Sequence, residues 1–235
     1  MIAFNRFLET IRVKIREELN PIMGKLRRKR LINCNFTIIS NNCWAGHVYR
    51  YFGLPYSSPT IGLYFYAEDY VKLCENLLYY MSQELKFISV EKSKYKDDLK
   101  KFQHHCPIGV LDDIEVIFLH YKSEDEAYEK WNRRKQRIVW DNIFYKMSEQ
   151  NLCREIDLKR FDRLETDKKF VFVSRDYGLS SQILWGGNVK TVIFLMILYC
   201  LGNLWIRLNG LMEIFLLENN NLIIGKFKTL IFMYA

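Results

Sequence analysis

Residues 36–47 limit the possible folds of this 235-residue chain more than any other stretch. They begin with FTII, a run typical of a buried strand. A polar triplet follows, Ser40, Asn41 and Asn42, and the residues from Trp44 onward favour a helix. A strand that continues directly into a helix is typical of an α/β fold. Ligands of such folds bind where strand carboxyl ends meet helix N-termini, so we expect the functional site to include this triplet.

Strand-like and helix-like segments continue to alternate along the chain. Further strands are predicted at residues 60–66, 87–91, 108–111, 114–121 and 169–174. Helices are predicted at residues 44–52, 67–85, 124–138, 141–148 and 155–163. Ser123 and Glu126 form a capping-box pattern at the start of one of these helices. The alternation predicts one α/β domain at 33–190, with a mostly parallel sheet and helices on both faces in three layers.

Composition excludes wholesale disorder and argues against a nucleic-acid partner. Hydrophobic residues make up 49% of the chain and aromatic residues 15%, enough for a substantial core. The formal net charge is +8, of which residues 1–32 contribute +6 and residues 181–235 contribute +2. Residues 33–180 are therefore neutral overall and lack the basic surface that nucleic-acid binding requires.

The six cysteines are scattered along the chain without any C-x-x-C pair. They are Cys34, Cys43, Cys74, Cys106, Cys153 and Cys200. A disulfide-stapled secreted domain is usually shorter and denser in cysteine. The N-terminus also lacks the unbroken apolar segment of a secretory signal. These observations predict a reduced, cytoplasmic protein.

Residues 1–32 form a separate N-terminal segment with two open interpretations. Apolar residues recur at helical spacing up to Pro21, and a basic run follows at residues 25–30. One interpretation is peripheral contact with an anionic membrane surface, through the apolar face and the basic run. The other is a leader helix packed on the core, with the charges in solvent.

The composition changes again at about Thr191. Residues 191–235 contain no Asp and no Pro, and the apolar run at 192–201 is shorter than the roughly 20 residues of a spanning helix. A frameshift is a competing explanation for this atypical tail. Codons from Thr191 onward can be chosen so that a neighbouring frame encodes GYIPDDTLLFGKPLDTFKWFDG, which has the turns and acids of an ordinary folded sequence.

A cysteine and a histidine are the candidate catalytic residues. Cys43 lies beside the polar triplet, and His120 closes the predicted strand at 114–121. In a parallel sheet both could reach the same edge and form a nucleophile–base pair. The alternative is that Cys43 is a small buried hydrophobic residue.

Other residues are candidates for ligand binding. Ser40, Asn41 and Asn42 could cap the next helix or receive an anion, and Gly46 would allow a close approach. Tyr121 follows His120 at the strand end. Trp131, Arg133, Arg134, Arg137 and Trp140 form either a phosphate-binding patch or a solvated helix face. His104, His105 and Cys106 have no second ligand cluster, so no metal site is predicted. No G-x-G-x-x-G, Walker or G-x-S-x-G motif is present, so the sequence leaves the cofactor unknown.

Three strings in the body of the chain resemble a known bacterial family. They are FTIISNNCWAGHVYRYFGLPYSSPTIGLYFYAEDYVKL, PIGVLDDIEVIFLHYKSEDEAYEKWNRRKQRI and WDNIFYK, within residues 33–180. The family is one of unknown function, with members labelled exopolysaccharide or capsular polysaccharide biosynthesis proteins and sometimes acetyltransferases. Its recurring positions correspond to Ser40, Asn41, Asn42, Cys43, Trp44, Gly46, His120, Tyr121, Trp131, Arg134, Asp141 and Asn142.

The resemblance implies an α/β fold and a role in the assembly of cell-surface polysaccharide. We therefore expect an accessory or transferase-like protein that acts on a glycan or sugar-phosphate intermediate. The rival expectation is a non-catalytic module that binds such an intermediate, or a partner, at the membrane face.

Overall fold

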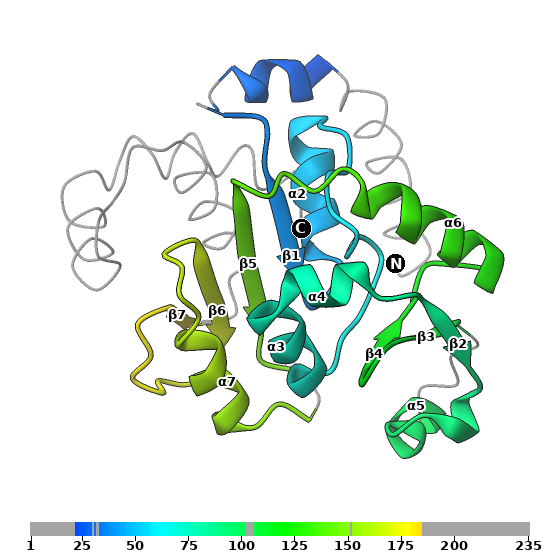
Figure 1. Ribbon diagram of the computed structural model, residues 1–235. Helices are drawn as coiled ribbons and strands as arrows, with labels where there is room; N and C mark the ends of the chain where they lie inside the picture. The colour runs from blue at the N-terminus through cyan, green and yellow to red at the C-terminus, as the bar shows by residue number, and fades with distance from the viewer. Residues whose placement is uncertain (1–21, 30, 32, 102–105, 151, 185–235) are drawn as a thin grey trace, which may run out of the picture. The chain divides into compact units, whose positions relative to one another are not determined.

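The computed structural model describes residues 22–29, 31, 33–101, 106–150 and 152–184 (Figure 1). Predictions about the helix before Pro21, about His104 and His105, and about the tail at 191–235 lie outside the described residues. The chain divides into two compact units, and the larger consists of Asn35–Tyr49 and Pro55–Gly187. The larger unit contains the α/β domain.

A four-stranded parallel sheet forms the centre of this domain. Its strands are β1 (Thr37–Ser40), β5 (Ile143–Ser148), β6 (Lys169–Val173) and β7 (Gln182–Leu184), in the order β1-β5-β6-β7. All three neighbouring pairs are parallel. The carboxyl ends of these strands therefore meet along one edge of the sheet.

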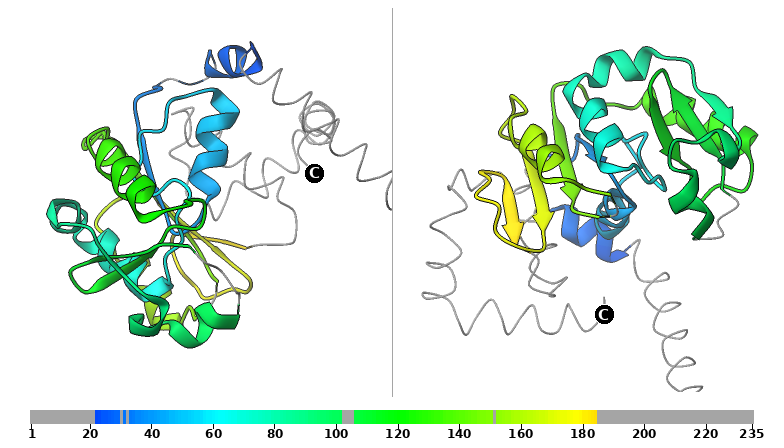
Figure 2. Two further views of the ribbon diagram at one scale, coloured as in Figure 1. Left: turned by 90° about the vertical axis from the view of Figure 1, so that its right-hand side faces the viewer. Right: turned by 90° about the horizontal axis from the view of Figure 1, so that it is seen from below.

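Helices cover both faces of the parallel sheet. Helix α2 (Trp44–Phe52) packs on one face, where the Trp44 ring lies 5.6 Å from the Phe170 ring. Helices α3 (Ala67–Glu75) and α7 (Glu155–Asp162) pack on the opposite face and join its buried side chains in the main core. Figure 2 shows α2 on one side of the strands and α3 with α7 on the other. The predicted three-layer α/β arrangement is confirmed.

The remaining strands form a separate antiparallel sheet. The sequence predicted these strands, but it did not predict that they form a sheet of their own. Its strands are β2 (Lys86–Ile88), β3 (Ile108–Leu111) and β4 (Ile114–Ile117), in that order. The Asp112–Asp113 turn between β3 and β4 lets the chain reverse, and Asp112 has a φ of 55°. The prediction of a mostly parallel sheet therefore holds for the four-stranded sheet and does not extend to this one.

Four further helices belong to the larger unit. They are α4 (Leu77–Ser82), the 3-10 helix η1 (Val90–Lys92), α5 (Lys96–Lys101) and α6 (Glu124–Lys135). The Ser123 hydroxyl accepts the Glu126 backbone N–H at 3.2 Å, which confirms the predicted N-cap of α6.

Several predictions of secondary structure were wrong. Most of the helix predicted at 141–148 is strand β5, at residues 143–148, whose side chains alternate between the two covered faces of the sheet. Residues 60–66 form no strand and make one isolated bridge, Tyr64 with Ile117. The helix predicted at 67–85 is interrupted at Asn76, whose φ of −141° is not helical. Strand β7 was missed.

The smaller unit includes a helix at residues 22–28. Arg27 of the predicted basic run is buried, and its Nη1 donates to the Tyr51 carbonyl oxygen at 2.9 Å. Its guanidinium also lies 4.1 Å from the centroid of the Tyr51 ring. Arg27 is therefore engaged within the protein, and membrane contact through this segment stays a prediction. No helix among the described residues is both long enough and apolar enough to cross a bilayer.

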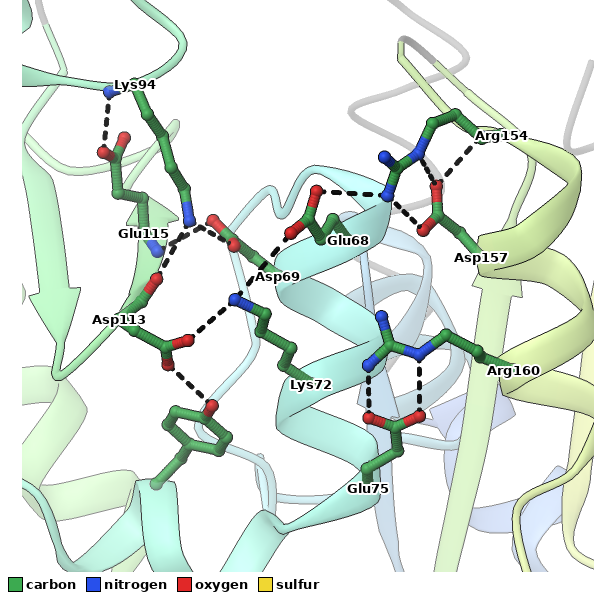
Figure 3. A network of polar contacts seen from close by, with 11 residues as sticks. Glu68, Asp69, Lys72, Glu75, Lys94, Asp113, Glu115, Arg154, Asp157 and Arg160 are labelled. Atoms are coloured by element: carbon green, nitrogen blue, oxygen red, sulfur yellow. Dashed lines mark hydrogen bonds and ion pairs between the residues drawn. The ribbon is translucent and has the colours of Figure 1, made fainter.

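A network of ion pairs links helix α3 to the β3–β4 hairpin and to helix α7 (Figure 3). On the hairpin side, Asp69 pairs with Lys94 at 2.5 Å and accepts the Glu115 backbone N–H at 2.9 Å. On the α7 side, the Arg160 guanidinium makes two hydrogen bonds to the Glu75 carboxylate, at 3.0 and 2.5 Å. Asp69 is fully buried, whereas the Lys94 side chain is 39% exposed, so the contact shielded from water is the one with the Glu115 backbone.

We expect Asp69→Ala to lower the free energy of unfolding by about 1–3 kcal/mol, since it leaves a buried backbone N–H without its acceptor. Chemical denaturation measures the change. Glu84→Gln is the control, because Glu84 pairs with Lys86 at 3.8 Å on the exposed surface. That variant should stay within about 0.5 kcal/mol of the parent. Equal effects of the two substitutions would contradict the assignment of Asp69 as a structural anchor.

Candidate active site at the carboxyl edge of the parallel sheet

Two strand ends and one turn build the site. Asn41 follows β1, and its side-chain oxygen accepts the Ser148 backbone N–H at 2.9 Å. Its amide nitrogen donates back to the Ser148 carbonyl oxygen, also at 2.9 Å. Asn42 Oδ1 accepts the Trp44 backbone N–H at 3.2 Å and so caps α2. These contacts bind the ends of β1 and β5 to the start of α2.

The structure brings Cys43 and His120 together. Cys43 directly precedes α2, and its Sγ lies 3.1 Å from His120 Nε2. His120 lies in a turn after β4, three residues beyond the last residue of that strand. A single hydrogen bond therefore connects the thiol and the imidazole, which is the contact that proton transfer between them needs.

The segment Ile61–Leu63 supports both members of this pair. The Gly62 carbonyl oxygen accepts the His120 backbone N–H at 3.3 Å, and the Leu63 carbonyl oxygen lies 4.0 Å from Cys43 Sγ. Gly62 has a φ of +76°, a conformation that residues with a side chain rarely adopt. A Cβ at Gly62 would lie 3.5 Å from His120 Cβ. Glycine thus allows the histidine turn to approach the segment.

Tyr121 and Arg134 hold this supporting segment in place. The Tyr121 hydroxyl donates to the Ile61 carbonyl oxygen at 2.7 Å, and Arg134 Nη1 donates to the same oxygen at 2.9 Å. Arg134 also donates to the Tyr121 hydroxyl. Both side chains are buried. Their observed role is to position the segment next to the Cys43–His120 pair.

Lys146 lies inside the site although the sequence did not predict it. Its side chain is fully buried on the α2 face of β5. Its Nζ lies 2.9 Å from Asn42 Oδ1 and 2.6 Å from Ser148 Oγ. We call Asn42, Cys43, His120, Lys146 and Ser148 the carboxyl-edge cluster.

Burial moves the pKa of two groups in this cluster. It raises the pKa of the Cys43 thiol, so the protonated thiol is favoured at neutral pH. It lowers the pKa of the Lys146 amine well below its usual range, which favours the neutral amine. A neutral amine does not stabilise a thiolate, so Cys43 needs a base within reach in order to react. His120 is at the right distance to be that base.

Three of the predicted ligand-binding residues do not join the cluster. Asp141 and Asn142 lie at the amino end of β5, the opposite edge of the sheet, where Asn142 Oδ1 accepts a hydrogen bond from Lys168 at 2.8 Å. Trp131 is 1% exposed and packs in the main core, so it cannot form a surface patch with the arginines of α6. The charged residues around Trp131 in the sequence of α6 suggested an exposed position.

The other predicted residues lie at or beside the cluster in supporting positions. Ser40 is buried, and its backbone N–H donates to Thr60 Oγ1 at 3.1 Å. The Trp44 ring lies 5.6 Å from Lys146 Nζ. Gly46 is buried against Ile61, whose Cγ2 would be 3.4 Å from a Cβ at that position. Gly46 thus serves packing between two parts of the chain.

Sequence reasoning missed Lys146, Ser148 and Gly62. The first two were assigned to a helix, which concealed that they share one face of a strand. The sequence of β5, Ile-Phe-Tyr-Lys-Met-Ser, does contain an indication, because Lys146 lies between apolar residues that are typical of a buried strand. Within the described ranges, no three His, Cys, Asp or Glu side chains gather in a metal-binding group.

Fold and site together define a class: α/β proteins with a cysteine–histidine pair at the carboxyl edge of a parallel sheet. The chain belongs to the family described as "Domain of unknown function (DUF1919)", which matches residues 14–198. It is also similar to a protein of Haemophilus influenzae described as uncharacterized. The two are 32% identical over 168 residues, which cover 70% of this chain and 76% of the relative.

Proposed function

We propose that this protein is a transferase that moves an acyl group, by way of Cys43, onto a glycan intermediate of cell-surface polysaccharide synthesis. The observation that carries the proposal is the 3.1 Å distance between Cys43 Sγ and His120 Nε2. The glycan acceptor is inferred from the resemblance of residues 33–180 to proteins labelled for polysaccharide synthesis. The two parts of the proposal are tested separately.

The first half of the reaction acylates Cys43. The sulfur attacks the carbonyl carbon of an acyl donor, and the thiol proton passes to His120 Nε2. The new S–C bond forms a thioester as the bond from carbon to the donor's leaving group breaks. His120 then returns the proton to the leaving group. This role requires the tautomer of His120 with its proton on Nδ1.

The second half transfers the acyl group. A sugar hydroxyl attacks the thioester carbon, and its proton passes to His120. The O–C bond forms, the S–C bond breaks, and His120 returns the proton to the sulfur. The exposed position of His120 leaves its ring accessible to an acceptor from solvent.

The contacts of the carboxyl-edge cluster support a catalytic role more than a role in binding alone. Asn41 and Asn42 use their amide groups to hold Ser148 and the start of α2 within the protein. Cys43 and His120 are the pair whose contact has no evident structural need, since a thiol–imidazole hydrogen bond adds little to stability. A functional reason for that contact is therefore the better explanation.

The experiment uses p-nitrophenyl acetate, an activated acyl ester, with the full chain. We expect one acetyl group on Cys43, located by peptide mass spectrometry, and none there in Cys43→Ala. Cys153→Ala is the matched control, because Cys153 is also half-buried but its Sγ contacts the Arg154 carbonyl oxygen at 3.9 Å. This control should be acetylated like the parent. An unmodified Cys43 in the parent would overturn the proposed thiol chemistry.

The acceptor is tested on the acetylated protein. Free hexoses and hexosamines should shorten the lifetime of the acetyl group on Cys43 and themselves become acetylated. If the acetyl group is lost only to water, the glycan part of the proposal fails while the thiol chemistry stands. If the parent binds an oligosaccharide without becoming acylated, the rival class of a binding module is favoured.

A further inference from the structure

The mechanism through Cys43 makes no use of Lys146, and a fully buried lysine needs an explanation. Its Nζ lies between Asn42 Oδ1 at 2.9 Å and Ser148 Oγ at 2.6 Å. The rings of Trp44 and Phe172 lie 5.6 and 5.4 Å from the same nitrogen. The amine is thus enclosed by two polar contacts and two aromatic rings.

No carboxylate of the described residues forms an ion pair with Lys146. A buried ammonium without an opposite charge is strongly disfavoured. Burial accordingly lowers the pKa of this amine well below its usual range. The titratable group that faces it is Cys43, which is itself favoured as the neutral thiol. A neutral amine has a free electron pair and can accept a proton.

Ser148 is placed to give up that proton. It is the last residue of β5, half-buried at the carboxyl edge. Its Oγ accepts a hydrogen bond from Asn42 Nδ2 at 3.3 Å and one from Lys146 Nζ at 2.6 Å. When the amine is neutral, the second contact can reverse, so that the hydroxyl donates to Nζ. Asn41 holds its backbone from both sides, at 2.9 Å each. The hydroxyl is therefore fixed next to the amine.

We propose that Ser148 is a second nucleophile of this site, with Lys146 as its general base, and that it reacts with activated esters. The proposal does not depend on Cys43 and His120. In the reaction, Ser148 Oγ attacks the carbonyl carbon and its proton moves to Lys146 Nζ. The O–C bond forms, the bond to the leaving alcohol breaks, and Lys146 passes the proton to that alcohol.

Ser174 provides an internal comparison. It follows β6 at the same edge of the sheet and is more exposed than Ser148. Its hydroxyl donates to Glu149 Oε2 at 2.9 Å, so its neighbour is a carboxylate. A carboxylate is a much weaker base than a neutral amine. If exposure alone decided reactivity, Ser174 would react faster with an activated ester. If activation of the hydroxyl by a base decides it, Ser148 reacts faster.

The test is covalent labelling of the full chain with a fluorophosphonate, followed by peptide mass spectrometry. Oγ forms a bond to phosphorus, fluoride leaves, and the hydroxyl proton moves to Lys146. We expect the label on Ser148 in the parent and also in Cys43→Ala. Lys146→Met keeps the volume of the side chain and should lower the labelling rate about 100-fold or more. Ser174→Ala should not change it.

Two results would overturn the proposal. One is a label on Ser148 that is no greater than that on Ser174 in the parent, a comparison that needs no variant. The other is an undiminished rate in a Lys146→Met variant whose circular dichroism matches that of the parent. Labelling of Ser148 in the Cys43→Ala variant, together with no acetylation of Cys43 in the parent, would support this proposal and refute the proposed thiol chemistry.

Discussion

Replacing His120 with alanine is expected to lower the rate of Cys43 acetylation by about 100- to 10,000-fold, the usual contribution of a general base. The reason is the state of the thiol. Burial raises the pKa of Cys43 and keeps it protonated at neutral pH. Without the imidazole at 3.1 Å, attack must wait for a thiolate that forms rarely. The measurement is the rate of p-nitrophenol release together with the mass of the acetylated peptide.

The rate of Cys43 acetylation should depend on pH differently in the parent and in His120→Ala. In His120→Ala, acetylation depends on thiolate formed in water, so its rate should climb as pH rises toward the raised pKa of Cys43. The parent has a base at hand and should depend less on pH in that range. The gap between the two proteins should therefore narrow as the solution becomes more alkaline.

His47→Ala is the control, because His47 is an exposed histidine on α2 outside the carboxyl-edge cluster. It should react like the parent across the whole pH range. A His120→Ala variant that is acetylated as fast as the parent at neutral pH would show that the imidazole is not the base.

The sequence predicted the place of the candidate site from the order of its elements. Alternating strands and helices imply a parallel sheet whose carboxyl edge holds ligands, and Cys43 lies at that edge because it comes three residues after the end of β1. His120 was expected at the same edge as the end of a parallel strand. It arrives from β4 of the antiparallel sheet, through a turn that the Gly62 carbonyl oxygen supports.

Other parts of the site depend on contacts that a single sequence does not contain. Lys146 comes 104 residues after Asn42, and their hydrogen bond exists because β1 and β5 are neighbours in the sheet. A strand order of this kind follows from packing of the whole domain. The same holds for Asp141 and Asn142. They lie far from the cluster because β5 runs away from them toward the carboxyl edge, and its direction is not evident from the sequence.

Gly62→Ala is expected to slow Cys43 acetylation by about 100-fold, because a displacement of roughly 1 Å in a reacting group costs that much. An alanine Cβ would lie 3.2 Å from Tyr121 Cε2 and 3.5 Å from His120 Cβ. Tyr121 cannot easily move away, because its hydroxyl donates a hydrogen bond to the Ile61 carbonyl oxygen and accepts one from Arg134. The histidine turn must then shift, and the imidazole moves away from Cys43.

Loss of stability is a separate consequence of the same substitution, and Gly178→Ala isolates it. Gly178 has a φ of +68°, close to the +76° of Gly62, but a Cβ there would meet no atom within 4 Å. Both variants should lose about 1–2 kcal/mol of unfolding free energy through backbone strain. Only Gly62→Ala should also lose reactivity at Cys43, measured at a temperature where both variants are folded. Equal acetylation rates in the two variants would mean that the Gly62 segment does not position His120, and that the close approach there serves folding alone.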